Sequence, residues 1–464
     1  MRVCLLNDSF PPIIDGVVNV VMNYASYLQK DFNSDIIVGT PAYPNTDYSR
    51  YPYPVVPYQS FDTTNIASGY RAGNPFNGKA VSLLSDFRPE IIHSHCPASA
   101  TIIARILREQ TDAPVVFTYH TKYDIDIERT VKIKPLAKEG IQAMVSNIEA
   151  CDDVWVVSKG AGESLKALGY SGKYRVMNNG VDFAKGRVAD DLVAQAVAGY
   201  DLPAGVPMFL FVGRMMTYKG LPLILDALKL LSDSGQDFRM VFIGKGPDRE
   251  LLEKQAEKLK IRDKVIFTGP IYDRDVLRAW NTRADLFLFP STFDTNGLVV
   301  REAAACGLAS MLIEGSCAAE GITDGRNGFT IQETPEAMAA LLKEASTDLP
   351  HLHEVGMNAM DEIYLSWEEC VALAHHRYME VLELKKQGRL VRAKDPTDFL
   401  VSLTALSMEG WDKYRKVRRA FFNDFRESAM GMLENIQEAE DNFDRYLDEM
   451  KTDIRDQLDE IWKA

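Results

Sequence analysis

The sequence predicts an α/β protein with two doubly wound domains that face each other across a cleft, followed by a helical extension. Short apolar runs alternate with helical patterns up to about residue 345, and a Gly- and Pro-bearing stretch at 182–207 divides the alternation into two series. Most runs are apolar throughout, as parallel strands buried on both faces are. At 464 residues the chain is too long for one ordinary core, which agrees with two domains or more.

Each predicted strand is a short run of apolar residues. In the first half of the chain the runs lie at 3–6, 36–39, 91–94, 115–118, 154–158 and 174–177. In the second half they lie at 208–212, 240–243, 265–268, 286–289, 310–313 and 328–331. Helical patterns lie between them, among them 17–28, 98–110, 221–231 and 248–260. Ligands of such folds bind outside the carboxyl ends of the strands, so the loops just after the strands are the candidate site.

The alternation divides the chain into four predicted parts, of which the last two are helical. We assign them to residues 1–185, 200–366, 367–390 and 391–464. We expect residues 367–386 to form one helix that packs back on the main body. From Ala429, apolar residues recur at a spacing of three to four over about four heptads, which predicts a coiled-coil-like helix and favours self-association.

Composition excludes several classes of protein. The chain is 46% hydrophobic and 25% charged, and no apolar run reaches the roughly 18 residues that span a bilayer. The N-terminal residues show no signal-peptide pattern, and the six dispersed cysteines form no CxxC pair, so we expect a cytoplasmic protein with reduced thiols. The net charge is −14, of which the last 44 residues contribute −8, and nucleic acid is therefore not an expected partner.

Two loops of the first half carry candidate binding residues. In NDSFPPIIDGV at 7–17, Gly16 precedes a predicted helix, where it could let the backbone approach an anion; a simple turn explains it equally well. In FTYHTKYD at 117–124, His120 directly follows a buried strand; a histidine there is often structural, but its place at the carboxyl end favours contact of the imidazole with a substrate hydroxyl. Asp124 and Asp126 imitate a metal-binding DxD motif, but we interpret them as a solvated loop and predict neither a metal nor another cofactor.

A third loop, VGRMMTYKG at 212–220, carries two cations after a buried strand. Arg214 offers a planar fork for phosphate oxygens, and Lys219 supplies a compact charge five residues later. The alternative is a surface loop with two solvated cations.

A fourth loop, FDTNGLVVREAAACG at 293–307, opens an apolar helix between two carboxylates. Asp294 and Glu302 lie eight positions apart, and Glu302 needs a partner in so apolar a setting. Thr295 and Asn296 are predicted to cap the helix, which would place Glu302 two turns into it. Gly297 and Leu298 then present free N–H groups, which favour a diphosphate.

Taken together, these loops resemble the retaining glycosyltransferases of family 4, whose GT-B architecture has two Rossmann-like domains. The resemblance covers roughly residues 1–385 and rests on IIDGV, TYHTKYD, GRMMTYKG, FIGKGPDRELLE and the two carboxylates with seven residues between them. It implies that residues 1–185 bind the acceptor and that residues 200–366 bind a nucleotide-sugar donor.

The resemblance also implies a role for each candidate residue. Gly16 would lie by the donor diphosphate, and Arg214 and Lys219 would neutralise it. His120 and Asp294 would contact hydroxyls of the transferred sugar. The remaining donor-binding residues are those at the nucleoside and at the helix start: Gly269 and Tyr272 beside the base, Glu302 at the ribose, and Asn296, Gly297 and Leu298 at the helix N-terminus.

One residue departs from the family's pattern. The first carboxylate of the motif is usually glutamate, and Asp294 is one methylene shorter, which implies a different donor sugar, a closer loop or a weaker activity. A catalytically silent sugar-nucleotide-binding protein that acts through its helical tail is therefore an alternative. A sugar-nucleotide epimerase shares the architecture but would need an acid/base set that the sequence does not display.

The TYHTKYD loop and GSCAAEG at 315–321 are most similar to the branch that glucosylates diacylglycerol in bacterial membranes. This similarity implies UDP-glucose as donor, a lipid acceptor and a peripheral place on the inner face of the membrane. The basic and aromatic stretch KYRKVRRAFF at 413–422 would suit an anionic membrane, but its cations could equally pair with the acidic tail. A soluble sugar or a polysaccharide precursor stays open as the acceptor.

Overall fold

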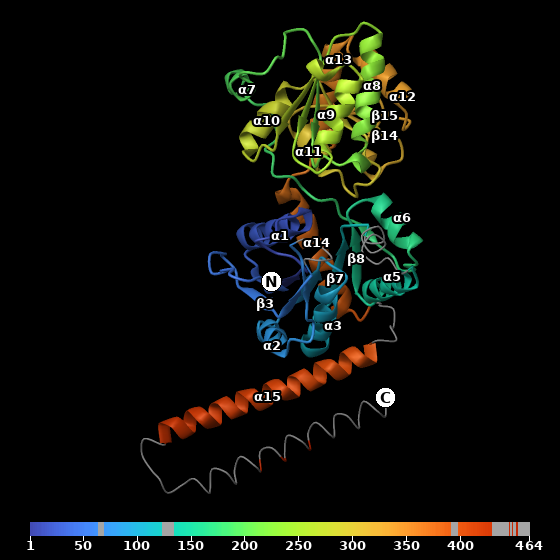
Figure 1. Cartoon of the computed structure of the whole chain (residues 1–464). Helices are drawn as coiled ribbons and strands as arrows, with labels where there is room; N and C mark the ends of the chain where they lie inside the picture. The colour runs from blue at the N-terminus through green and yellow to red at the C-terminus, as the bar shows by residue number, and fades with distance from the viewer. Residues whose placement is uncertain are drawn as a thin grey trace.

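The computed structural model describes residues 1–63, 69–122, 134–390 and 398–428, together with residues 445, 448 and 452. Two α/β domains follow each other along the chain, and each is built on a parallel sheet (Figure 1). The helix α14 (Trp367–Lys386) runs from the second domain back onto the first, and the long helix α15 (Asp398–Ser428) lies across the end of the first domain that faces away from the second (Figure 1). Among the described residues, no helix combines the length and the hydropathy that crossing a membrane requires.

The first domain contains a seven-stranded parallel sheet in the order β3-β2-β1-β6-β7-β8-β9. Its strands are β1 (Arg2–Leu6), β2 (Asp35–Pro41), β3 (Val55–Tyr58), β6 (Ile91–Ser94), β7 (Val115–Tyr119), β8 (Asp153–Val156) and β9 (Arg175–Val176). The helices of this domain are α1 (Gly16–Phe32), α2 (Gly78–Asp86), α3 (Ser99–Thr111), α5 (Lys134–Glu149) and α6 (Lys159–Ala167). A small antiparallel pair, β4 (Ser60–Asp62) and β5 (Arg71–Gly73), lies outside the main sheet.

The second domain contains a six-stranded parallel sheet in the order β12-β11-β10-β13-β14-β15. Its strands are β10 (Met208–Val212), β11 (Arg239–Ile243), β12 (Val265–Gly269), β13 (Leu286–Phe289), β14 (Ser310–Ile313) and β15 (Phe329–Ile331). Its helices are α7 (Asp190–Ala196), α8 (Leu221–Asp233), α9 (Arg249–Lys258), α10 (Arg274–Arg283), α11 (Leu298–Ala305), α12 (Pro335–Ala345) and α13 (Leu349–Glu362).

All twelve predicted strands are confirmed, with end positions that differ by at most two residues. The central strands β1, β6, β7, β10 and β13 are buried over nearly their whole length, which is why their sequences are continuously apolar. The strands β3, β4 and β5 were not predicted. β3 contains Pro57, which cannot donate to a neighbouring strand, and it is accommodated because β3 forms the edge of the sheet.

Helix α14 (Trp367–Lys386) has the predicted bounds and packs against α1. It begins with a capping box, in which the Ser366 hydroxyl accepts from the Glu369 backbone and the Glu369 carboxylate accepts from Ser366. Arg377 then holds the first domain through two hydrogen bonds to the Asp153 carboxylate, at 2.7 and 2.8 Å. Because α14 follows the second domain in sequence, this contact ties the two domains together.

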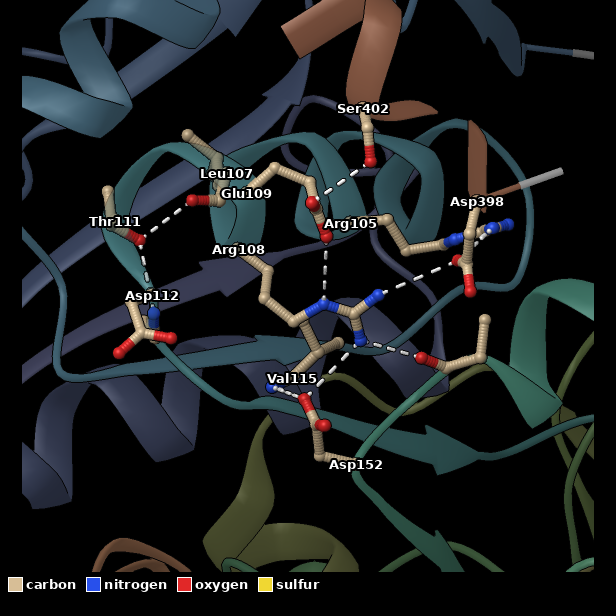
Figure 2. Close-up of polar contacts among 12 residues, drawn as sticks. Arg105, Leu107, Arg108, Glu109, Thr111, Asp112, Val115, Asp152, Asp398 and Ser402 are labelled. Atoms are coloured by element: carbon tan, nitrogen blue, oxygen red, sulfur yellow. Dashed lines mark hydrogen bonds and ion pairs between the residues drawn. The ribbon is translucent and has the colours of Figure 1, made fainter. Parts of the chain in front are cut away.

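Helix α15 (Asp398–Ser428) packs against α2 and α3 of the first domain. Figure 2 shows Arg105 and Arg108 of α3 pointing toward Asp398, the first residue of α15. Arg105 Nη2 donates to Asp398 Oδ1 at 2.9 Å, and Arg108 Nη1 lies 3.4 Å from Asp152 Oδ2. The predicted heptad pattern after Ala429 falls almost entirely outside the described residues.

Candidate active site

A cavity of about 670 Å³ lies between the two domains, at the carboxyl ends of their strands. Eight of the eleven predicted site residues line it. They are Gly16, His120, Arg214, Lys219, Asp294, Asn296, Gly297 and Leu298. Further first-domain residues that were not predicted as site residues also line it, among them Asn7, Asp8, Ser9, Asp15 and Tyr70. The first-domain and second-domain residues of this cavity come together only because the two domains face each other across the cleft.

The N-terminus of α1 forms part of the wall on the first-domain side. Asp15 caps the helix, since its Oδ1 accepts from Val18 N at 2.8 Å and its Oδ2 accepts from the Tyr70 hydroxyl at 2.9 Å. A Cβ built on Gly16 would meet no atom within 4 Å, so the backbone at this terminus borders open space. A ligand can therefore approach these N–H groups closely.

The N-terminus of α11 forms the facing wall, and it differs from the prediction. The helix begins at Leu298 after Gly297, which has a left-handed conformation at φ 61°, and no side chain caps it. The prediction that Thr295 and Asn296 cap this helix is wrong. Their side chains instead cross to the first domain: the Thr295 hydroxyl donates to His120 O at 2.6 Å, and Asn296 Nδ2 donates to Val157 O at 2.5 Å. The first N–H groups of α11 are consequently left for a ligand.

Lys219 and Asp294 form an ion pair inside the cavity. Lys219 Nζ donates to Asp294 Oδ2 at 2.9 Å and to Oδ1 at 3.2 Å, and the Ser291 hydroxyl donates to the same carboxylate at 2.8 Å. Gly220 makes this geometry possible, because it has a positive φ of 77° and a Cβ there would lie 2.5 Å from Pro290 O. The two residues are 75 positions apart in sequence and are joined only by this close approach of two loops.

Arg214 lines the same cavity and is exposed. Within the part of the chain that the structure describes, no hydrogen bond or ion pair engages its guanidinium. Together with Lys219 and the two helix termini, it makes one end of the cavity favourable for an anion with several oxygens.

Glu302 lies on α11 but does not line the cavity. Because the helix begins at Leu298, Glu302 is its fifth residue, little more than one turn from the start rather than the predicted two. The partner expected for it is Arg274, whose Nη2 donates to Glu302 Oε1 at 2.7 Å. The Glu302 side chain is only 15% exposed, and burial raises the pKa of its carboxyl while Arg274 opposes that rise.

Gly269 and Tyr272 also lie outside the cavity wall. Gly269 ends β12, and its carbonyl accepts from Gly244 N at 3.0 Å at the carboxyl edge of the sheet. Tyr272 is 75% exposed, and its hydroxyl accepts from Lys245 Nζ at 3.1 Å. Their predicted place beside a base stays a prediction.

His120 directly follows β7, is buried, and lines the cavity. Its Nε2 lies 3.0 Å from Nδ1 of His95, a residue that follows β6 and that the sequence analysis did not single out. Burial lowers the pKa of His120 to about 3, so its imidazole is neutral near pH 7. The motif HSH at 93–95 could have indicated a partner, because alternate residues of a strand share one face.

No group of three or more His, Cys, Asp or Glu side chains in the described ranges is arranged to hold a metal ion. Asp124 and Asp126 lie outside those ranges, so the interpretation of the DxD sequence stays a prediction.

Two family models match the chain, one on each domain. The model "Glycosyltransferase Family 4" matches residues 14–185, and "Glycosyl transferases group 1" matches residues 196–361. The chain belongs to glycosyltransferase family 4. The family predicted from the four loops and the predicted GT-B fold class are thereby confirmed.

Among curated relatives of this family member are two alpha-monoglucosyldiacylglycerol synthases. The protein from Streptococcus pneumoniae (strain ATCC BAA-255 / R6) is 23% identical over 408 residues, which are 86% of this chain and 89% of the relative. The protein from Acholeplasma laidlawii is 23% identical over 395 residues, which are 79% of this chain and 97% of the relative.

Similar solved structures support the fold. Anabaena Alr3699/HepE in complex with UDP matches with a TM-score of 0.65 at 16% identity, over 82% of this chain and all of that chain. Sucrose-phosphate synthase from Thermosynechococcus elongatus matches with a TM-score of 0.64 at 18% identity, over 82% and 99%. At this level of identity the likeness establishes the GT-B architecture alone.

Proposed function

We propose that this glycosyltransferase moves glucose from UDP-glucose to diacylglycerol or a related glycolipid, with retention of the anomeric configuration. The observation that carries the proposal is the composition of the interdomain cavity. Two cations and an uncapped helix N-terminus form one wall, and an imidazole, carboxylates and hydroxyls face them. A sugar nucleotide needs this combination, because its diphosphate is anionic and its sugar presents hydroxyl groups.

The donor end would be held by the second domain. Arg214 and Lys219 would bind the diphosphate together with the first N–H groups of α11. Lys219 donates to the Asp294 carboxylate, so on donor binding Lys219 would become shared between Asp294 and a phosphate oxygen. We propose that Asp294, held in turn by Ser291, accepts from a hydroxyl of the transferred sugar.

Several donor contacts extend beyond the cavity wall. Glu302 would accept from the ribose hydroxyls while it keeps its bond to Arg274. Gly269 and Tyr272 would flank the base, and Gly16 would lie by the diphosphate from the first-domain side.

The chemical step separates charge, and the cavity is arranged to stabilise that charge. The bond between the anomeric carbon and the phosphate oxygen breaks, positive charge develops on the sugar, and negative charge develops on the departing UDP. Arg214, Lys219 and the α11 terminus stabilise the departing diphosphate as preorganised dipoles and charges. The acceptor hydroxyl forms the new bond on the face that UDP leaves, and its proton passes to the departing phosphate oxygen. No metal ion or organic cofactor is part of this proposal.

The lipid acceptor is supported by the two alpha-monoglucosyldiacylglycerol synthases, which match this chain over nearly their full length. The basic stretch at 413–422 supports it less. Lys413 pairs with Glu409 at 3.2 Å and Lys416 pairs with Asp86 at 2.9 Å, which neutralises part of its charge. We therefore propose a peripheral place at the inner face of the membrane on the basis of the acceptor rather than of this stretch.

The test is a thermal-shift and nucleotide-release screen against a panel of nucleotide sugars, with and without diacylglycerol micelles. Stabilisation by UDP-glucose and faster UDP release with the lipid are expected, and NMR of the product should show the α-anomer. A Lys219→Ala variant should lose release, whereas Lys229→Ala, which removes a partly exposed lysine of α8 paired with Asp233, should not. Release that only a soluble sugar accelerates would replace the lipid acceptor. Binding without release under any acceptor would favour the silent binding protein.

A further inference from the structure

Three histidines form a buried cluster behind the candidate active site. His93 and His95 lie on one face of β6 and its extension, and His120 follows the neighbouring strand β7. The ring centroids of His93 and His95 are 4.0 Å apart, and those of His95 and His120 are 5.3 Å apart with nearly parallel planes. His93 and His95 are fully buried, and only His120 reaches the cavity. The cluster thus runs from the core of the first domain to the substrate side.

His93 has a hydrogen-bond partner on both ring nitrogens. Its Nδ1 lies 2.5 Å from the hydroxyl of Tyr378 on α14, and its Nε2 lies 2.7 Å from Thr118 Oγ1. The Tyr24 ring packs edge-on against both His93 and His95, at 5.6 and 5.5 Å. These contacts hold the rings of the cluster in fixed orientations, and α14 supplies one of them.

His95 is different, because only its Nδ1 has a partner. That nitrogen lies 3.0 Å from His120 Nε2, whereas His95 Nε2 is buried with no hydrogen-bond partner among the described residues. Both rings are neutral, since burial lowers the pKa of each far below its ordinary value. In a neutral pair one ring must donate and the other must accept.

The unpartnered nitrogen decides between the two arrangements. If His120 donated from Nε2, the proton of His95 would have to sit on its Nε2, where a buried N–H would have no acceptor. If His95 donates from Nδ1, its Nε2 carries only an unused lone pair. Buried N–H groups without an acceptor are rarer than unused acceptors, so the second arrangement is favoured.

We propose that His95 is a positioning residue, which donates from Nδ1 to His120 Nε2 and so holds the His120 proton on Nδ1, directed toward the substrate. His120 would then serve only as a donor to an oxygen of the transferred sugar. This role of His120 as a donor to the sugar rests on the proposed function, whereas the tautomer of His120 does not. The assignment gives the buried histidine at position 95 a purpose: its proton fixes which nitrogen of its neighbour carries hydrogen.

The tautomer can be measured without substrate on the full chain. Long-range proton–nitrogen NMR of protein labelled with 15N-histidine distinguishes protonated from unprotonated ring nitrogens, and a His120→Gln variant assigns the His120 signals. We expect His120 to be protonated on Nδ1. His95→Asn and His95→Leu are matched in size, but only the asparagine keeps an N–H near the position of Nδ1. His95→Asn should preserve the tautomer, and His95→Leu should shift His120 toward Nε2–H or a mixture.

A His93→Leu variant is the control for loss of packing, because it replaces another histidine of the cluster by leucine without removing a contact to His120. It should leave the His120 tautomer unchanged. Protonation of His120 on Nε2 in the unmodified protein would overturn the proposal, as would a tautomer that His95→Leu does not alter. Where a variant is too unstable for NMR, the unmodified protein alone still decides the first point.

Kinetics test the consequence for the reaction. His95→Leu should lower kcat/KM for the donor roughly tenfold, the effect of one hydrogen bond, and His95→Asn should recover most of that loss. Equal losses in both variants would show that His95 acts through packing alone. An absence of glycosyl transfer in the unmodified protein would refute the proposed function and leave the NMR result standing.

Discussion

The ion pair between Asp398 of α15 and Arg105 of the first domain leads to a stability prediction whose size follows from the structure. Asp398 accepts from Arg105 at 2.9 Å, and Arg108 Nη2 lies 3.9 Å from the same oxygen. The Arg105 side chain is 2% exposed and that of Asp398 is 20% exposed, so the carboxylate neutralises cations that water reaches poorly. We predict that Asp398→Ala destabilises the first domain and loosens α15.

The expected size lies below the full cost of breaking a buried ion pair. Removing one partner of such a pair costs about 3–5 kcal/mol. Here Arg105 Nη1 keeps its bond to Asn147 Oδ1 at 2.6 Å, Arg108 Nη1 keeps the Ala150 carbonyl at 2.7 Å, and Asp398 is partly hydrated. We therefore expect about 2 kcal/mol, or about 4–8 °C in the midpoint of thermal unfolding.

The assay is thermal unfolding of the full chain, with hydrogen exchange of α3 and α15 to locate the effect. Lys416→Ala is the matched control, because it removes an ion pair between the same helix and Asp86 whose side chains are 58% and 56% exposed. That variant should shift the midpoint by about 1 °C or less. Asp398→Asn should fall between the two. A shift for Asp398→Ala no larger than that of Lys416→Ala would refute the reasoning.

Three further predictions concern the candidate site. Lys219→Ala should lower kcat for transfer by roughly 10²–10³ while it weakens donor binding far less, which single-turnover kinetics beside calorimetry would show; equal losses would argue against a role for Lys219 in stabilising the leaving group. The Glu320 carboxylate accepts from the first two backbone N–H groups of α6 across the cleft, at 2.7 and 2.5 Å, and should therefore hold the two domains together. Glu320→Ala should raise KM for the donor roughly tenfold and enlarge the radius of gyration measured by solution scattering, and an unchanged radius would contradict this. Folding lowers the pKa values of His93, His95 and His120, so below about pH 6.5 the unfolded chain binds more protons than the folded protein. The free energy of unfolding should therefore fall on acidification by about 1.4 kcal/mol per pH unit for each histidine. His95→Leu should reduce the slope by the share of one histidine, and an unchanged slope would show that His95 is protonated in the folded state.

The fold was predictable because its signals are local. A run such as Met208–Val212 is apolar at every position because both faces of its strand are covered, and this shows in five consecutive residues. β3 escaped prediction because the prolines around it suppress the strand signal, and its edge position, which makes Pro57 acceptable, is a tertiary property.

The candidate site was predictable in its residue types and less so in its connections. Thr295 and Asn296 have the composition of helix caps, and only the proximity of β7 and β8 makes their side chains cross the cleft instead. The pairing of His95 with His120 was missed for the same reason. The motif HSH at 93–95 indicates that a partner could lie there, but neither local segment determines that residues 25 positions apart meet.

The sequence by itself determined the two parallel sheets, the edge of each sheet at which folds of this class bind ligands, and the cations that lie at that edge. These follow from periodicity and residue chemistry, which act over a few neighbouring positions. Tertiary structure alone decided which charges meet, as with Lys219 and Asp294, which carboxylate is satisfied, as with Glu302 and Arg274, and which nitrogen of His120 contacts His95. Those outcomes depend on distances of about 3 Å between segments far apart in the chain, and such distances exist only once the two domains and α14 have packed.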